Sequence, residues 1–170
     1  MDRTKTYQEF DRSRLRLQPL ADRQHLLDLG CLLALEPRRS VPKGLKAVAG
    51  RIKQARADGA AVVLMMGAHV LRSGVQRYLI DMIEKGYLTC LAMNGAGVIH
   101  DFEFALAGAT TESVAHYIQE GQFGLWRETG IINDIVRRAA RRGQGLGEAV
   151  GRYIERQDLP HKEVSVLAAG

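Results

Sequence analysis

Two short apolar runs separated by an amphipathic segment constrain the fold of this chain more than any other feature. Ala60–Met66 and Leu88–Met93 are continuous apolar runs of strand length. Between them, Val75, Leu79, Met82 and Ile83 recur at helical spacing, and a Lys-Gly pair follows as a typical helix end. Strand, helix and strand in this order predict one right-handed βαβ unit. Because parallel strands are normally buried, we expect both strands to be covered on both faces.

A turn rich in small and polar residues follows each predicted strand. Gly67-Ala68-His69 follows the first strand, and Asn94-Gly95-Ala96-Gly97 follows the second. Ligands of parallel α/β sheets bind outside these carboxyl ends. The second turn opens into a predicted helix, so its N–H groups suit a phosphate. It is only part of a dinucleotide fingerprint, since His100 occupies the third glycine position, and a tight turn that serves packing alone is the alternative.

His100, Asp101 and Glu103 follow this turn at the start of the predicted helix. His100 and Glu103 are three residues apart and share a helical face. A helix start lowers the pKa of a carboxyl or an imidazole, so these groups could act as a base, a ligand or a ribose anchor. Capping and ion pairing at the helix start are the structural alternative. A metal-dependent hydrolase using His69, His100 and Asp101 is a further hypothesis, although no recognised metal spacing is present and no Ser-His-Asp arrangement can be assigned.

The remaining sequence predicts mainly helices. Residues 1–19 are polar and basic and are assigned as an arm, and residues 20–170 as a single α/β domain. Further helices are expected over residues 22–35, from Pro42 to a stop at Asp58-Gly59, over residues 111–120 and 127–142, and from about Leu146 to a stop at Pro160. Ser73-x-x-Gln76 is predicted as a capping box, and Val164–Ala168 as a third strand. We therefore predict a Rossmann-like parallel sheet with helices on both faces. The sheet is expected to be incomplete at its C-terminal end, since nothing covers the third strand.

Composition and charge bound the possible partners and compartment. The chain has 170 residues and a net charge of +5, which weakly favours an anionic ligand. Few aromatic residues and no binding motif argue against nucleic acid. Cys31 and Cys90 are far apart in apolar surroundings, and we predict two buried thiols in a reducing compartment. No signal-like segment and no apolar run of about 20 residues is present, so a cytoplasmic protein without a membrane segment is expected.

The segment from Gly67 to Glu103 resembles the first conserved region of deoxyhypusine synthases and their homospermidine-forming bacterial relatives. The similar features are a strand with a polar turn ending in Ser73-Gly74, a helix, a second strand and a small-residue turn before Asp101. Arg127–Ile131 and the predicted final strand also resemble that family. The resemblance implies a Rossmann-like NAD-binding fold, a homotetramer with sites at dimer interfaces, and NAD-dependent aminobutyl transfer from a polyamine to an amine acceptor.

The resemblance also implies roles for individual residues. Cofactor contacts fall in the first turn and in the second turn: Gly67, Ala68, His69, Arg72, Asn94, Gly95, Ala96, Gly97 and His100. Substrate contacts fall on His100, Asp101 and Glu103, where His100 and Ile99 replace the acidic pair of the family. The catalytic lysine of the family has no counterpart in this chain, so catalytic residues stay unassigned.

The sequence thus leaves three functional hypotheses. The first is the N-terminal half of a deoxyhypusine-synthase-like enzyme that binds NAD and a polyamine-like molecule. This half would be completed by a homo-oligomer or by a companion chain. The second is a non-catalytic module of the same fold that oligomerises through its unfinished sheet and the loop containing Trp126. The third is the metal-dependent hydrolase.

Overall fold

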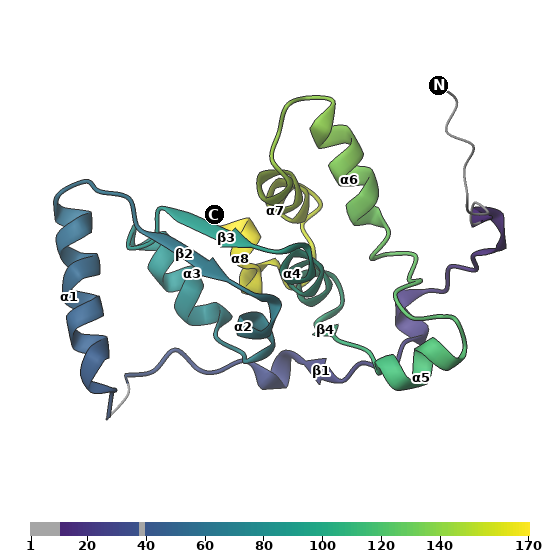
Figure 1. Cartoon of the computed structure of the whole chain (residues 1–170), viewed down its shortest axis with the longest axis horizontal. Helices are drawn as coiled ribbons and strands as arrows, with labels where there is room; N and C mark the ends of the chain where they lie inside the picture. The colour runs from purple at the N-terminus through teal and green to yellow at the C-terminus, as the bar shows by residue number, and fades with distance from the viewer. Residues whose placement is uncertain (1–10, 38–39) are drawn as a thin grey trace, which may run out of the picture.

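Helix α4 (Gly95–Ala107) is the central element of the structure, a computed structural model that describes residues 11–37 and 40–170 (Figure 1). The helix is buried on more than one face. Phe102 packs against helices α6 and α7, whereas Phe104 packs against Leu32 and Val164 from the two ends of the chain. The other elements, with η for 3₁₀ turns, are η1 (Arg12–Arg14), η2 (Leu20–Asp22), β1 (Leu27–Asp28), η3 (Leu29–Cys31), α1 (Lys43–Ala57), β2 (Val63–Met66), α2 (Ala68–Arg72), α3 (Gln76–Glu84), β3 (Cys90–Met93), β4 (Ala109–Thr110), α5 (Val114–Gln119), α6 (Ile131–Ala140), α7 (Leu146–Arg156), η4 (Lys162–Val164) and α8 (Val166–Ala169).

The predicted βαβ unit is present. Strand β2 pairs with β3 in parallel, and the register runs from Val63 opposite Cys90 to Met66 opposite Met93. Helices α2 and α3 form the crossover between the two strands. The turns at Gly67 and Asn94 therefore lie at the same edge of the sheet and lead directly into α2 and α4. This confirms an α/β chain with a parallel strand pair, although the only other sheet in the described residues is the short antiparallel pair β1–β4.

The predicted third strand at Val164–Ala168 is wrong. This segment forms η4 and then α8. The cause is the buried carboxylate of Asp101, which accepts hydrogen bonds from the Ser165 hydroxyl at 2.5 Å and from the Val166 and Leu167 N–H groups at 2.8 and 3.2 Å. These bonds satisfy the free N–H groups of a helix start, so the apolar run becomes helical.

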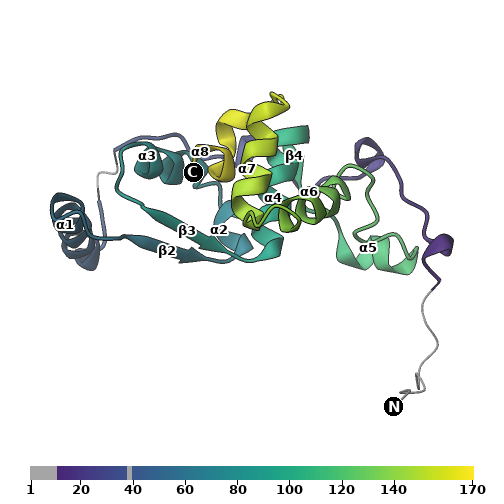
Figure 2. The same ribbon diagram turned by 90° about the horizontal axis from the view of Figure 1, so that it is seen from above.

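The expectation that both faces of the strand pair are covered is also wrong. Leu64 and Met66 pack against a cluster that includes Leu71 of α2 and Val166 of α8. In Figure 2, helices α3 and α8 lie on one side of β2 and β3, and no described element covers the other side. Side chains alternate along a strand, so Met65 is 81% exposed on the open face.

Two further predictions about burial are wrong or only partly confirmed. Cys90 is exposed rather than buried, because it is paired with Val63 on the outward side of the strands, while Cys31 is half-buried. Helix α1 is present as predicted, but it buries no residue, and Leu45 and Val48 of its apolar stripe are about half exposed.

The predicted helix over residues 22–35 is wrong as well. Leu27, Leu29 and Leu32 pack in the cluster around Phe104, whereas Leu26 is 57% exposed. The backbone runs as an irregular strap along the core, and Leu26 and Leu29 donate hydrogen bonds to the carbonyls of residues 111 and 108. Leu27 and Asp28 also pair with Thr110 and Ala109 of β4, so the segment is extended there rather than helical.

Smaller corrections concern helix starts and the N-terminal arm. Ser73 donates to the Val70 carbonyl at 2.6 Å instead of capping α3, which has no side-chain cap. Helix α5 is capped by Ser113. Residues 1–10 of the predicted arm lie outside the described residues, and Gln18 pairs with the backbone next to Trp126. No helix in the described ranges has the length and hydropathy needed to cross a membrane.

The contact between α7 and α8 yields a first prediction. A Cβ atom at Gly151 would lie 2.0 Å from the carbonyl oxygen of Leu167, a backbone atom that no side-chain rotation can move. We expect Gly151→Ala to lower the free energy of unfolding by about 2 kcal/mol, as overpacking of a core does, despite the better helix propensity of alanine. Urea unfolding measures this change.

Gly147 on the same helix provides the matched control. Its Cβ would make an ordinary contact at 3.7 Å with the Leu167 side chain. Gly147→Ala should therefore leave stability unchanged or raise it by up to about 1 kcal/mol. Equal effects of the two substitutions would contradict the close approach of α7 and α8.

Candidate functional site

A cavity of about 330 Å³ lies beside the first half of α4, close to the carboxyl ends of β2 and β3. One wall is a single helical face of α4, with positions i, i+3, i+4 and i+7 occupied by Ala96, Ile99, His100 and Glu103. The remaining lining comes from the N-terminal strap, from α2 and from the segment between β4 and α6: Arg23, Arg72, Thr111, Glu112, Val114, Phe123, Gly124, Trp126 and Thr129. The cavity thus combines charged groups with aromatic and aliphatic surface.

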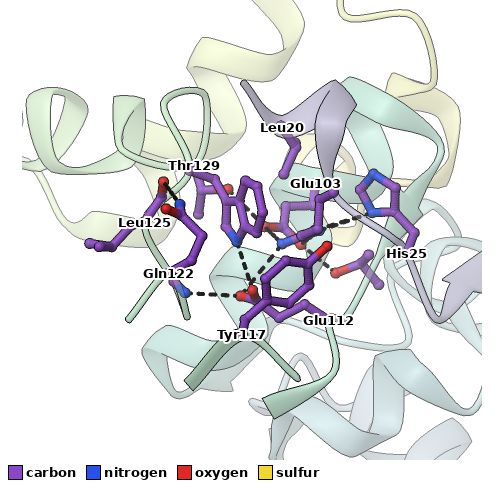
Figure 3. Close-up of polar contacts among 12 residues, drawn as sticks. Leu20, His25, Glu103, Glu112, Tyr117, Gln122, Leu125 and Thr129 are labelled. Atoms are coloured by element: carbon purple, nitrogen blue, oxygen red, sulfur yellow. Dashed lines mark hydrogen bonds and ion pairs between the residues drawn. The ribbon is translucent and has the colours of Figure 1, made fainter. Parts of the chain in front are cut away.

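The floor of the cavity is a buried ion pair between Glu103 and Arg23 (Figure 3). The Arg23 guanidinium donates two parallel hydrogen bonds, to Glu103 Oε1 at 2.9 Å and to Oε2 at 2.7 Å. The hydroxyls of Thr110 and Thr129 donate to the same carboxylate at 2.6 and 2.7 Å. Burial alone would raise the pKa of Glu103, but the hydrogen bonds and charge of Arg23, with the two hydroxyls, outweigh it and hold this pKa below its usual value.

The aromatic wall is fixed to the same ion pair. The Trp126 indole N–H donates to Glu112 at 2.8 Å, and its ring packs edge-on against Tyr117 with centroids 5.1 Å apart. Arg23 lies 5.6 Å from the Trp126 ring centroid, and its guanidinium is 3.9 Å from Glu112. The Arg23 guanidinium, the Glu112 carboxylate and the Trp126 indole therefore contact one another, and these contacts make the aromatic wall rigid.

His100 is neutral and has a defined tautomer. Its Nδ1 lies 2.8 Å from the Thr110 hydroxyl, whose proton is donated to Glu103. Nδ1 must therefore donate to that hydroxyl, which leaves Nε2 as the acceptor of the ring. Burial lowers the pKa of His100, and the nearby positive charges of Arg72 and Arg23 lower it further. At neutral pH the ring is an uncharged hydrogen-bond acceptor.

Arg72 supplies the positive charge at the end of the cavity nearest the sheet. It is the last residue of α2, and its Nη1 lies 3.4 Å from Nε2 of His69. Its Nε is buried and has no hydrogen-bond partner among the described residues. A buried donor without a partner is costly, so a ligand oxygen placed there would gain a charge-assisted hydrogen bond.

The structure brings together part of the residue set that the sequence singled out. Arg72, Ala96, His100 and Glu103 line the cavity, whereas Asp101 faces away from it into the α8 contact. The other predicted cofactor positions lie at the strand ends next to the cavity rather than in its lining: Gly67, Ala68, His69, Asn94, Gly95 and Gly97.

Two of these strand-end residues have a structural role. The Asn94 side chain caps α4 by accepting a hydrogen bond from the Gly97 N–H at 3.0 Å. A Cβ at Gly97 would lie 2.8 Å from the Met93 sulfur, so close packing is enough to explain glycine there.

Sequence reasoning missed the residues that complete the site. Arg23 is 80 residues from Glu103, and no local pattern connects the two. Glu112 and Thr129 also come from segments without a motif. The only available signal was the loop containing Phe123 and Trp126, where aromatic residues and glycines are unusually dense.

The proposed metal set is not assembled. Both Asp101 oxygens are bonded to Ser165 and to the start of α8, while His100 faces Thr110 and His69 is exposed beside Arg72. Within the described ranges, no group of three His, Cys, Asp or Glu residues is arranged to hold a metal ion. The metal-dependent hydrolase hypothesis has no geometric support.

Comparison with known proteins identifies a family different from the one that the sequence resembles. Residues 46–150 match the family described as "Arginine dihydrolase ArgZ-like, C-terminal, Rossmann fold". No curated protein and no solved structure matches the chain. The resemblance to deoxyhypusine synthases is therefore wrong, and with it the predicted aminobutyl transfer from a polyamine. The Rossmann-like character of the chain is retained by the match.

The buried ion pair generates a second prediction. Glu103→Gln leaves the Arg23 guanidinium without its main counter-charge in a buried site. We expect the free energy of unfolding at pH 7 to fall by about 3 kcal/mol, the cost of breaking a buried pair. Glu155→Gln is the matched control, because Glu155 pairs with Lys162 at the surface and its loss should cost less than about 0.5 kcal/mol.

The same variant gives a pH dependence with a fixed sign. The pKa of Glu103 is lowered in the folded state, so its stabilisation is complete above the unfolded-state value of about 4.5 and is lost as the pH falls through the folded-state value. The stability difference between the native chain and Glu103→Gln should shrink below pH 4.5. A difference that grows in acid would contradict this assignment.

Proposed function

Since this chain belongs to the ArgZ-like C-terminal Rossmann-fold family, we propose that it is a nucleotide-binding domain whose ligand occupies the α4 cavity. The observation that carries the proposal is the buried, unpartnered Nε of Arg72 in a cavity beside two parallel strand ends. Rossmann-type sheets bind ligands at this edge, with the phosphate near a helix start. The proposal concerns binding, and no catalytic residue is assigned.

The phosphate end of the ligand is proposed to lie between Arg72 and the first turn of α4. Ala96 in that turn lines the cavity, and the nearby carboxylate of Glu103 is already neutralised by Arg23. Arg72, by contrast, has no ion-pair partner in the described ranges, so its positive charge is uncompensated. A phosphate or another small anion would pair with this positive charge.

The other end of the cavity suits an uncharged ring and its ribose. Ile99, Val114 and Phe123 give apolar surface, and the neutral His100 offers an acceptor for a hydroxyl or an amide N–H. NAD combines these features with phosphate and is the first nucleotide to test. As a cofactor of this chain, NAD remains a proposal.

The family description also bears on the wider context of the domain. It names the C-terminal part of proteins similar to an arginine dihydrolase. We propose that this chain supplies the nucleotide site in such a context.

A binding titration tests the proposal. NAD, AMP and nicotinamide mononucleotide are titrated separately into the protein by calorimetry. We expect Arg72→Gln to weaken binding about tenfold, the effect of losing one charge-assisted hydrogen bond of roughly 1.5 kcal/mol. The matched control is Arg77→Gln, an exposed arginine outside the cavity, which should leave affinity within about twofold. Absence of binding by all three nucleotides would refute the proposed function.

We also propose that the open face of β2 and β3 packs against a second copy of the chain. Parallel strands are rarely left uncovered, yet Met65 is 81% exposed and Val63 is 53% exposed on this face. Leu45 and Val48 of α1 add exposed apolar surface from a helix that buries no residue of its own. Such a surface is typical of an association site.

Light scattering coupled to gel filtration tests this association. The native chain should elute as a defined oligomer, and Met65→Lys should shift the population to monomer by placing a charge in the apolar contact. Ile118→Lys, on the exposed side of α5, is the control and should leave the oligomer intact. A monomeric native chain at all accessible concentrations would show that the open face does not pair with itself.

A further inference from the structure

Helices α6 and α7 enclose a second hollow of about 460 Å³ that shares no lining residue with the α4 cavity. Ile135, Arg138 and Ala139 of α6 line one side, together with Arg142 in the turn after that helix. One face of α7 lines the other side, with Ala149, Arg152, Tyr153 and Arg156. Ile135, Ala139 and Ala149 are buried and form the floor. The other lining residues include four arginines: Arg138, Arg142, Arg152 and Arg156.

The charge of this hollow is uncompensated. Arg152 pairs with Glu148 at 2.8 Å, but Arg138, Arg142 and Arg156 have no ion-pair partner within the described residues. Arg138 makes only a local bond, from Nε to the Asp134 carbonyl at 3.2 Å. In the described residues, Glu148 is thus the one carboxylate that forms an ion pair with any of these four guanidiniums. Like charges gathered in a concave site attract an anion strongly, because the surrounding protein focuses the field.

We propose that this hollow, here called the α6–α7 arginine site, binds an oligophosphate, either free or as the phosphate chain of a nucleotide. Guanidinium groups match phosphate oxygens through paired N–H donors, and several guanidiniums around one hollow favour a ligand with more than one phosphate. Tyr153 lies on the same face and offers a ring against which a base could stack.

A small ligand fits this site better than a long polyanion. The volume falls in the range of small-molecule pockets, whereas nucleic-acid surfaces are extended and carry several aromatic residues for stacking. Tyr153 is the one aromatic residue of the lining. The site is therefore compact, strongly basic and poor in stacking surface, which describes a phosphate pocket.

Calorimetric titration at fixed ionic strength tests the inference, with tripolyphosphate, ATP, orthophosphate and a single-stranded oligonucleotide as probes. We expect tripolyphosphate and ATP to bind and orthophosphate to bind at least about tenfold more weakly, since it reaches fewer guanidiniums. Equal affinity for tripolyphosphate and ATP identifies the phosphate chain as the recognised group, and tighter binding of ATP adds a contact from the nucleoside. Binding of the oligonucleotide without binding of tripolyphosphate would overturn the proposal.

Neighbouring arginines supply matched variants. Arg142→Gln and Arg156→Gln should each weaken tripolyphosphate binding about tenfold, whereas Arg141→Gln removes the same charge from a residue outside the lining and should change it less than about twofold. Equal losses for residues 141 and 142 would show a general charge effect and refute a site. Arg77→Gln, at an exposed arginine outside both linings, should leave tripolyphosphate binding within about twofold, and NAD titrated into Arg142→Gln should bind as it does to the native chain, which separates this result from the nucleotide proposal for the α4 cavity.

Discussion

The ion pair between Arg23 and Glu103 is the interaction on which the site depends. It joins the N-terminal strap to α4, orders Thr110 and Thr129, and through Thr110 sets the tautomer of His100. A buried pair of this kind adds little net stability compared with an apolar substitute, but it is costly to break. Its effect here is to fix the positions of polar groups around one cavity. The same carboxylate therefore serves the fold and the site together.

The sequence predicted those parts of the fold in which local pattern and environment agree. The two parallel strands β2 and β3 and the helices α1, α6 and α7 were predicted within a few residues of their observed positions. The run at Val164 is apolar and short, so periodicity cannot separate strand from helix there. The helical conformation is stabilised by the Asp101 carboxylate, which is 64 residues away from Ser165 in the sequence. Similarly, the leucines of residues 22–35 follow a helical spacing, but the segment is held extended by the pairing of Leu27 and Asp28 with β4.

The candidate site was predictable only where it follows directly from the strands. The rule that parallel strands present ligands at their carboxyl ends led to His100 and Glu103 without a structure, whereas Arg72 was selected only through the family resemblance. Arg23 and the Trp126 loop belong to the site through tertiary packing alone. The family was misidentified for a related reason. A βαβ unit followed by a small-residue turn is shared by many Rossmann-type domains, so these features indicate a fold rather than one reaction.

The two buried carboxylates of α4 have a consequence for how the chain folds. Glu103 is bonded to a residue 80 positions earlier, and Asp101 to one 64 positions later, so a single helix collects both ends of the described chain. Before those segments have docked, burial of the two α4 carboxylates would cost free energy, because neither has its hydrogen-bond partners. Two long loops must therefore close during folding before α4 is stable in its buried position. We expect slow, concerted folding kinetics, in which α4 consolidates late despite its helical sequence.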